Sequence, residues 1–160
     1  MRIANPMPLE IERKFLVISE AWKAHSGSLI RQGYLNCDPR SIVRIRVSGD
    51  SAWICIKTPS TGVTRAEFEY PIPRGDADVL LALCEAPLVE KIRYRLQFAG
   101  RLWEIDEFQG ANAGLVIAEV ELERAEDPVA LPAWIGAEIT EDPRYFNSNL
   151  AAHPYHQWKE

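Results

Sequence analysis

The sequence predicts an α+β protein, mainly antiparallel β, whose strands form a barrel or a strongly curved sheet. Hydrophobic and polar residues alternate with period two in eight segments, which is the pattern of half-buried strands. Turn-forming residues such as Ser48-Gly49-Asp50 and Ala99-Gly100 separate these segments. Many antiparallel strands with few helical patterns are typical of a barrel or a curved sheet.

The eight expected strands are bounded by these turns. In chain order they are Glu10–Val17, Leu29–Asn36, Ser41–Val47, Ala52–Thr58, Val63–Pro71, Leu88–Phe98, Arg101–Phe108 and Leu115–Arg124. One clear helix is expected over Asp76–Glu85, with Val79, Leu80 and Leu83 on its apolar face and Pro87 beyond its end.

The remaining segments predict only short elements. A short helix is expected around Ser19–His25. The tail from Asp127 contains several prolines, so we expect turns and short helices there. Asp142 is a suitable N-cap and Pro143 a suitable first residue for a last helix that runs toward Ala152.

Composition limits the class of protein. A chain of 160 residues with 47% hydrophobic and 26% charged residues fits one soluble domain, here residues 9–160 after an N-terminal extension, residues 1–8. No apolar run is long enough to span a membrane, and the first residues do not form a secretory signal. Three cysteines without a Cys-x-x-Cys motif favour a cytoplasmic location. The net charge of −5 argues against nucleic acid as the main partner.

Charged residues within the expected strands are organised by sign. Since side chains at i and i+2 share one face of a strand, each strand presents a row of charge. Basic rows contain Arg44 and Arg46, Lys57, and Lys91, Arg93 and Arg95. Acidic rows contain Glu10 and Glu12, Glu67 and Glu69, Glu104 and Asp106, and Glu119, Glu121 and Glu123. For any one strand, the simpler interpretation is that the charged row faces water.

Two features of the whole set favour a ligand-binding interior instead. Like charges recur about 7 Å apart along the strands, and such pairs repel unless a ligand neutralises them. The rows also separate by sign. The acidic set suits a hard divalent cation such as Mg²⁺ or Mn²⁺ and consists of Glu10, Glu12, Glu119 and Glu121. The basic set suits a polyanion and consists of Arg44, Arg46, Lys57, Lys91 and Arg93. Opposed across one lumen, the two sets would suit phosphoryl transfer.

The run Leu9-Glu10-Ile11-Glu12-Arg13-Lys14-Phe15 contains Glu-x-Glu-x-Lys and resembles the signature of the CYTH superfamily, also called triphosphate tunnel metalloenzymes. Further segments resemble the family in the same order. They are Arg31–Leu35, Val43–Arg46, Ile56-Lys57, Arg65–Glu69, Glu90–Tyr94, Trp103–Asp106, Ala118–Glu121, Glu138–Thr140 and Arg144-Tyr145. The chain looks most like the compact bacterial branch that hydrolyses inorganic tripolyphosphate.

This resemblance implies an eight-stranded closed barrel, a tunnel with charged side chains pointing inward. It makes Glu10, Glu12, Glu119 and Glu121 metal ligands, with Glu67, Glu69 and Asp106 assisting the metal or its waters. The phosphate-binding residues would be Lys14, Arg44, Arg46, Arg65, Lys91 and Arg93. A Lys–Tyr pair is proposed to activate the attacking water in similar compact members, and here it would be Lys57 and Tyr34. Neighbouring cations would help Lys57 act as a base by depressing its pKa.

The resemblance leaves several reactions open. The leading one is hydrolysis of tripolyphosphate to pyrophosphate and phosphate with Mg²⁺ or Mn²⁺. The alternatives on the same fold are a class IV-type adenylate cyclase, a thiamine triphosphatase, and a non-catalytic module that binds polyphosphate or a nucleoside triphosphate. A cyclase would need an adenine pocket, which no segment obviously supplies. A homodimer is compatible with the sequence.

Overall fold

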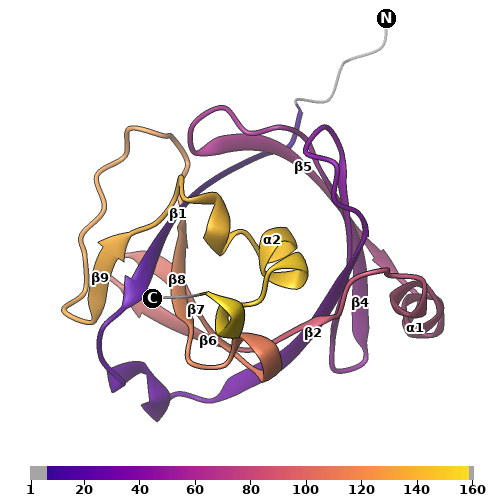
Figure 1. The fold of residues 1–160 in the computed structure, drawn as a ribbon. Coiled ribbons are helices and arrows are strands. Elements are labelled where there is room, and N and C mark those ends of the chain that lie inside the picture. The colour runs from indigo at the N-terminus through magenta and orange to yellow at the C-terminus, as the bar shows by residue number, and fades with distance from the viewer. Residues whose placement is uncertain (1–6, 159–160) are drawn as a thin grey trace, which may run out of the picture.

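The structure, a computed structural model, describes residues 7–158. Nine strands form one sheet, in the order β5-β4-β3-β2-β6-β7-β8-β1-β9. Their bounds are β1 (Leu9–Val17), β2 (Gly27–Asn36), β3 (Ile42–Ser48), β4 (Ser51–Lys57), β5 (Thr64–Ile72), β6 (Val89–Phe98), β7 (Arg101–Phe108), β8 (Val116–Glu121) and β9 (Ile135–Glu138). A further pairing of β5 with β1 closes the first eight strands into an antiparallel barrel (Figure 1). The predicted closed barrel of eight strands is therefore confirmed.

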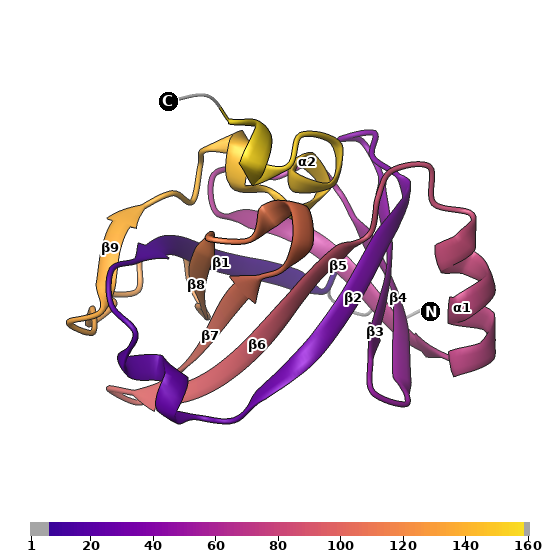
Figure 2. The same ribbon diagram turned by 60° about the horizontal axis from the view of Figure 1, so that its bottom comes forward.

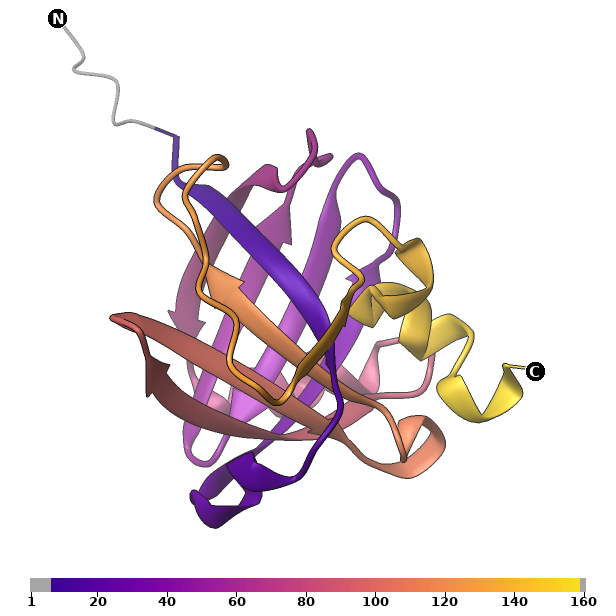
Figure 3. The ribbon, with the colours of Figure 1, turned by 90° about the vertical axis from the view of Figure 1, so that its left-hand side faces the viewer.

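Strand β1 is shared between three neighbours. Its residues Leu9 to Ile11 pair with β5, and Glu12 to Leu16 pair with β8 on the other edge. Where β1 leaves β5, the short β9 takes over that edge through Phe15↔Glu138 and Val17↔Ile135 (Figure 3). Strand β9 lies in the tail for which only turns and short helices were predicted, so that prediction was incomplete.

The hydrophobic core lies mainly outside the barrel. Phe15, Trp103 and Val120 point outward from β1, β7 and β8 and pack with Trp22 of the 3-10 helix η1 (Ala21–Ala24). The outward faces of β3 and β4 pack against helix α1 (Arg74–Ala82), which stands beside the barrel in Figure 1. Since the apolar rows are covered from outside, the charged rows are directed inward.

The C-terminal segment closes one end of the barrel. It contains η3 (Pro143–Tyr145), α2 (Asn147–Ala152) and η4 (Tyr155–Gln157), and lies across the opening in Figure 2 beside η2 (Gly110–Asn112). Leu150 and Ala151 of α2 pack in one buried cluster with Val89, Phe108 and Ile117 of the barrel. This apolar plug leaves the charged part of the interior below it.

Two predictions about helices need correction. The helix expected from Asp142 toward Ala152 is two helices, because Phe146 between them is extended (φ −67°, ψ 133°). Asp142 does cap the first of them, since its side chain accepts a hydrogen bond from the Arg144 amide.

Helix α1 also begins earlier than expected and presents a different face to the barrel. Its buried residues are Ala77 and Leu81, whereas Val79 and Leu83 are each 64% exposed. Only Leu80 of the predicted apolar face packs against this cluster. The barrel surface, rather than the helix's own pattern, selects the buried side.

This correction makes a testable prediction about stability. Leu81→Ala should lower the free energy of unfolding by about 2–5 kcal/mol, because it leaves a cavity against β3 and β4. Val79→Ala should change it by no more than about 0.5 kcal/mol, because that side chain is exposed. Urea unfolding of both variants measures the difference, and equal losses would contradict the observed helix face.

Two further expectations concern the chain outside the barrel. Residues 1–6 of the expected N-terminal extension lie outside the described residues; Pro8 accepts a hydrogen bond from the Glu67 amide through its carbonyl. Among the described residues, no helix has the length and apolar character required to cross a bilayer.

Candidate active site

The barrel encloses a cavity of about 780 Å³ beneath the C-terminal plug. Every one of the eight barrel strands contributes at least one charged or polar side chain to its wall. The predicted site residues that line it are Glu10, Glu12, Lys14, Tyr34, Arg44, Arg46, Lys57, Arg65, Glu67, Glu69, Lys91, Arg93, Glu119 and Glu121. Of the predicted site residues, only Asp106 does not border the cavity; it lies behind the wall and is fully buried.

One wall of the cavity is strongly acidic. Glu12 of β1 and Glu121 of β8 are directly opposite in the strand register. Burial and the neighbouring carboxylates Glu119 and Glu10 raise the pKa of Glu12, although Lys14 opposes them. Burial followed by repulsion from Glu10 and Glu12 also raises the pKa of Glu121. These residues carry more negative charge than the protein neutralises.

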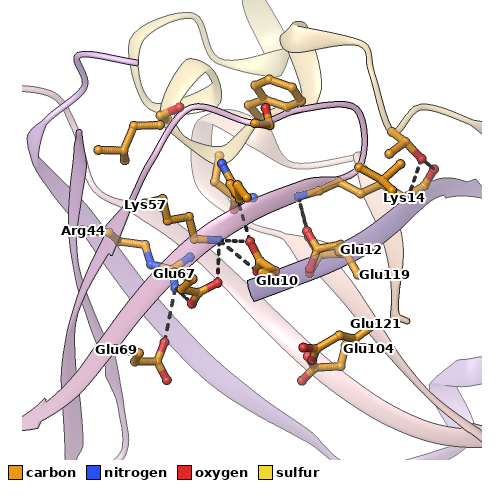
Figure 4. A pocket seen from close by; sticks show the side chains of 18 of the residues that line it. Glu10, Glu12, Lys14, Arg44, Lys57, Glu67, Glu69, Glu104, Glu119 and Glu121 are labelled. Carbon is orange, nitrogen blue, oxygen red and sulfur yellow. Dashed lines mark hydrogen bonds and ion pairs between the residues drawn. The ribbon is translucent and has the colours of Figure 1, made fainter. Parts of the chain in front are cut away.

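Glu121 is the clearest example of this excess. Among residues 7–158, no lysine or arginine lies within ion-pairing distance of its carboxylate. Figure 4 shows it beside Glu104, below Glu10, Glu12 and Glu119. A carboxylate without a protein cation, beside other carboxylates of the same wall, suits a hard divalent metal ion.

Lys14 joins the acidic wall to the basic residues. Its ammonium lies 3.0 Å from both Glu12 and Glu119. Burial alone would lower the pKa of Lys14, but the two carboxylates outweigh it and raise that pKa. Glu119 also accepts from Arg93 at 3.2 Å, and these cations hold the pKa of Glu119 well below its usual range despite burial.

A second group of charges lies on β4 and β5. The Lys57 ammonium lies 3.0 Å from Glu10 and 3.2 Å from Glu67, and Arg65 donates to Glu10 at 2.9 Å (Figure 4). Burial acts to raise the pKa of Glu67, but its neighbours Glu10 and Lys57 lower it to about 2. Glu67 is therefore an ionised carboxylate throughout the neutral range.

Two arginines of β3 face this group. Arg44 lies 3.6 Å and Arg46 2.9 Å from Glu69, and the Arg46 guanidinium also stacks 4.9 Å from the Trp53 ring. Burial raises the pKa of the adjacent Cys55 thiol to about 11. Cys55 is therefore a neutral thiol at neutral pH, and its complete burial fits a packing role.

Asp106 acts as a buried anchor for two cations of β6. Both of its oxygens accept from Arg93 at 2.7 Å, and one lies 2.6 Å from the Lys91 ammonium. Burial acts to raise the pKa of Asp106, yet the two cations lower it. Burial dominates at Lys91 and lowers its pKa to about 8. In this arrangement the carboxylate positions Lys91 and Arg93 toward the cavity.

The predicted Lys57–Tyr34 pair is not in direct contact. Within the described part of the chain, no hydrogen bond joins Lys57 and Tyr34, since Lys57 contacts the two glutamates. The Tyr34 hydroxyl accepts a hydrogen bond from Gln32 at 3.1 Å. Burial raises the pKa of Tyr34 to about 12, against the effect of Arg44 and Lys14. Tyr34 is therefore a neutral phenol at neutral pH.

Glu104, Gln32 and Asn147 line the cavity but were not predicted as site residues. Glu104 of β7 lines the cavity and pairs with Arg93 at 3.1 Å and Arg95 at 3.0 Å, which gives Arg95 a place at the exposed end of the basic row. Glu104 and Asp106 lie at i and i+2 on one strand, and this spacing could have indicated Glu104 as a site residue. Gln32 and Asn147 also line the cavity, but neither belongs to a charged row, so periodicity gave no signal for them.

Comparison with known proteins agrees with this geometry. The family model of the CYTH domain matches residues 8–155. The chain belongs to the CYTH domain family. The resemblance of the Glu-x-Glu-x-Lys run and of the ordered charged segments is thereby confirmed.

Two CYTH relatives are similar over almost their full length. An inorganic triphosphatase of Acetivibrio thermocellus is 50% identical over 156 residues, which cover 96% of this chain and 100% of the relative. An inorganic triphosphatase of Nitrosomonas europaea is 38% identical over 146 residues, covering 89% of this chain and 96% of the relative.

Solved structures show the same barrel. The crystal structure of an inorganic triphosphatase superposes with a TM-score of 0.65 at 35% identity, covering 89% of this chain and 93% of that one. A putative adenylate cyclase of Bacillus halodurans superposes with a TM-score of 0.59 at 18% identity, covering 74% of this chain and 83% of that one. The second comparison supports the fold alone.

Proposed function

We propose that this CYTH protein hydrolyses inorganic tripolyphosphate to pyrophosphate and phosphate with Mg²⁺ or Mn²⁺. The observation that carries the proposal is the opposition of an under-neutralised acidic wall and a basic wall within one enclosed cavity. A linear triphosphate brings several negative charges close together, so it needs both cationic side chains and metal ions. The names of the two CYTH relatives support this substrate.

The acidic wall would hold the metal. Glu10, Glu12, Glu119 and Glu121 supply carboxylate oxygens, the ligands that Mg²⁺ and Mn²⁺ prefer. Glu67 and Glu69 line the same cavity and would assist the metal or its waters. When bound, the metal supplies Lewis-acid stabilisation of phosphate oxygens.

Cations on the other walls would bind and orient the phosphates. They are Lys14, Arg44, Arg46, Arg65, Lys91 and Arg93. Each is paired with a carboxylate in the structure, so its position is fixed before substrate arrives. Preorganised cations stabilise developing charge without a reorganisation cost during the reaction.

Lys57 and Tyr34 would act on the attacking water or on the phosphoryl group that it attacks. Lys57 is held by Glu10 and Glu67, so metal ligation by Glu10 would free part of its hydrogen-bonding capacity. Tyr34 is a neutral phenol and can donate a hydrogen bond into the cavity. The free thiols Cys37, Cys55 and Cys84 support a reducing cytoplasm as the location.

A substrate panel tests the proposed reaction. Purified protein with Mg²⁺ or Mn²⁺ is expected to release phosphate and pyrophosphate from tripolyphosphate faster than it acts on ATP, thiamine triphosphate or longer polyphosphate. Omitting the metal should abolish turnover. Cyclic AMP as the main product from ATP would favour a cyclase, and preferred cleavage of thiamine triphosphate would favour a thiamine triphosphatase. Binding without any turnover would favour a non-catalytic module.

A further inference from the structure

Four side chains form a hydrogen-bonded chain across the closed end of the cavity. The Lys91 ammonium donates to Asn147 Oδ1 at 3.0 Å, and Gln32 Nε2 donates to the same oxygen at 3.1 Å. Gln32 Nε2 also donates to the Tyr34 hydroxyl oxygen at 3.1 Å. Gln32 and Lys91 are almost completely buried, so bulk water does not replace these partners. The chain links helix α2 to strands β6 and β2.

Lys91 fixes the direction of this chain. An ammonium group has three donors and no acceptor. Asn147 must therefore turn its oxygen toward Lys91, since the reverse orientation would set an amide NH₂ against the ammonium. Gln32 must then turn its own NH₂ toward Asn147, because two carbonyl oxygens would otherwise face each other.

This direction determines what Tyr34 can do. Its hydroxyl oxygen already accepts from Gln32, so its own proton is free to be donated elsewhere. Among residues 7–158, no acceptor for that proton is found, and Tyr34 borders the cavity. Among the described residues, Gln32 Oε1 is buried and has no hydrogen-bond partner, so this amide makes its hydrogen bonds through Nε2 alone.

We propose that Asn147 and Gln32 are positioning residues that hold Tyr34 as a hydrogen-bond donor to an anionic phosphoryl oxygen. The inference rests on the proposed function and narrows the role of Tyr34 within it from water activation to substrate binding. A phosphoryl oxygen only accepts hydrogen bonds, and a donor to an ionised group forms one of the stronger kinds of hydrogen bond. The raised pKa of Tyr34 keeps the required proton in place at neutral pH.

A double-mutant cycle tests this proposal through binding. Calorimetry without divalent metal measures tripolyphosphate affinity for the wild type, Tyr34→Phe, Asn147→Ala and the double variant. Each single change should weaken binding about 10-fold, the size of one lost hydrogen bond to a charged group. In Asn147→Ala, Gln32 is free to reverse and accept the Tyr34 proton. Tyr34→Phe should therefore cost almost nothing more in that background, and the same pattern is expected in kcat/KM with Mg²⁺.

Two further variants distinguish an effect of the hydrogen-bond direction from a general disturbance of the structure. Asn149→Ala removes another amide from α2, which donates to the Pro143 carbonyl and does not line the cavity, so its effect should add to that of Tyr34→Phe. Gln32→Glu keeps the shape but is acceptor-only at neutral pH, so it should capture the Tyr34 proton. Because its charge also repels the polyanion, affinity should fall at least as far as in Tyr34→Phe.

The outcomes distinguish this inference from the proposed function. Additive effects of Asn147→Ala and Tyr34→Phe, or wild-type affinity in Gln32→Glu, would overturn the inference even if turnover is normal. Binding of tripolyphosphate without hydrolysis would overturn the proposed function, yet the cycle would still report on the hydrogen-bonded chain. Failure to bind tripolyphosphate would overturn both.

Discussion

Glu121→Gln is expected to lower metal-dependent turnover sharply while stabilising the metal-free protein. In the absence of metal, this carboxylate faces Glu12 directly across the strand pair, and repulsion from Glu10 and Glu12 adds to burial in raising its pKa. Glutamine removes the repulsion and also removes one charged oxygen ligand. A single substitution therefore changes stability and activity in opposite directions.

The expected sizes follow from these two effects. Loss of a metal ligand removes several kcal/mol of charge stabilisation, so kcat should fall by a factor on the order of 10²–10³. Relief of one directly opposed like-charge pair should raise the free energy of unfolding by about 0.2–1 kcal/mol. Phosphate release and urea unfolding without metal measure the two changes.

Glu123→Gln provides the matched control. Glu123 undergoes the same change of charge, but it lies beyond the end of β8 and does not line the cavity. Its variant should keep wild-type turnover and stability. If Glu121→Gln lowered the stability of the metal-free protein, the carboxylate would already be neutralised by the protein, and the case for a metal at this wall would fail.

Asp106→Asn is expected to have the opposite effect on stability. Its carboxylate is fully buried and holds both Arg93 and Lys91. Removing one partner of a buried ion pair leaves uncompensated charge, which costs about 3–5 kcal/mol. Turnover should also fall, because both cations lose their fixed position. Thermal and urea unfolding together with steady-state kinetics measure the two losses.

A second substitution shows whether uncompensated buried charge causes the loss of stability in Asp106→Asn. Adding Lys91→Met to Asp106→Asn removes one of the stranded cations and should restore part of the stability but none of the activity. Asp38→Asn is the control, because Asp38 pairs only with the exposed Arg40 and should change stability little. If Asp106→Asn lowered the free energy of unfolding no more than Asp38→Asn does, the buried Asp106 carboxylate would contribute nothing to stability.

The charged rows were predictable because they depend on local periodicity. Glu10 and Glu12, or Lys91 and Arg93, share a face whatever the rest of the chain does. Periodicity alone could not decide whether that face points inward. In the structure, helix α1 and the segment around Trp22 cover the apolar rows from outside, and this long-range packing settles the direction.

The missed features all depend on contacts between distant segments. Strand β9 has only four residues and exists because β1 offers a free edge where it leaves β5. Asn147 enters the cavity because α2 plugs the barrel. The packing of β3 and β4 determines the buried face of α1, so Ala77 and Leu81 are covered and Val79 and Leu83 remain exposed.

The pairing of β1 with three other strands has a consequence for folding during synthesis. This strand precedes the others along the chain, yet its partners on β8 and β9 lie more than 100 residues later, and such distant pairing slows folding. During synthesis on the ribosome, β1 emerges first and must wait for almost the whole chain. Glu10 and Glu12 thus meet Glu119 and Glu121 only as the last strands arrive, and no shorter nascent chain holds a complete acidic wall.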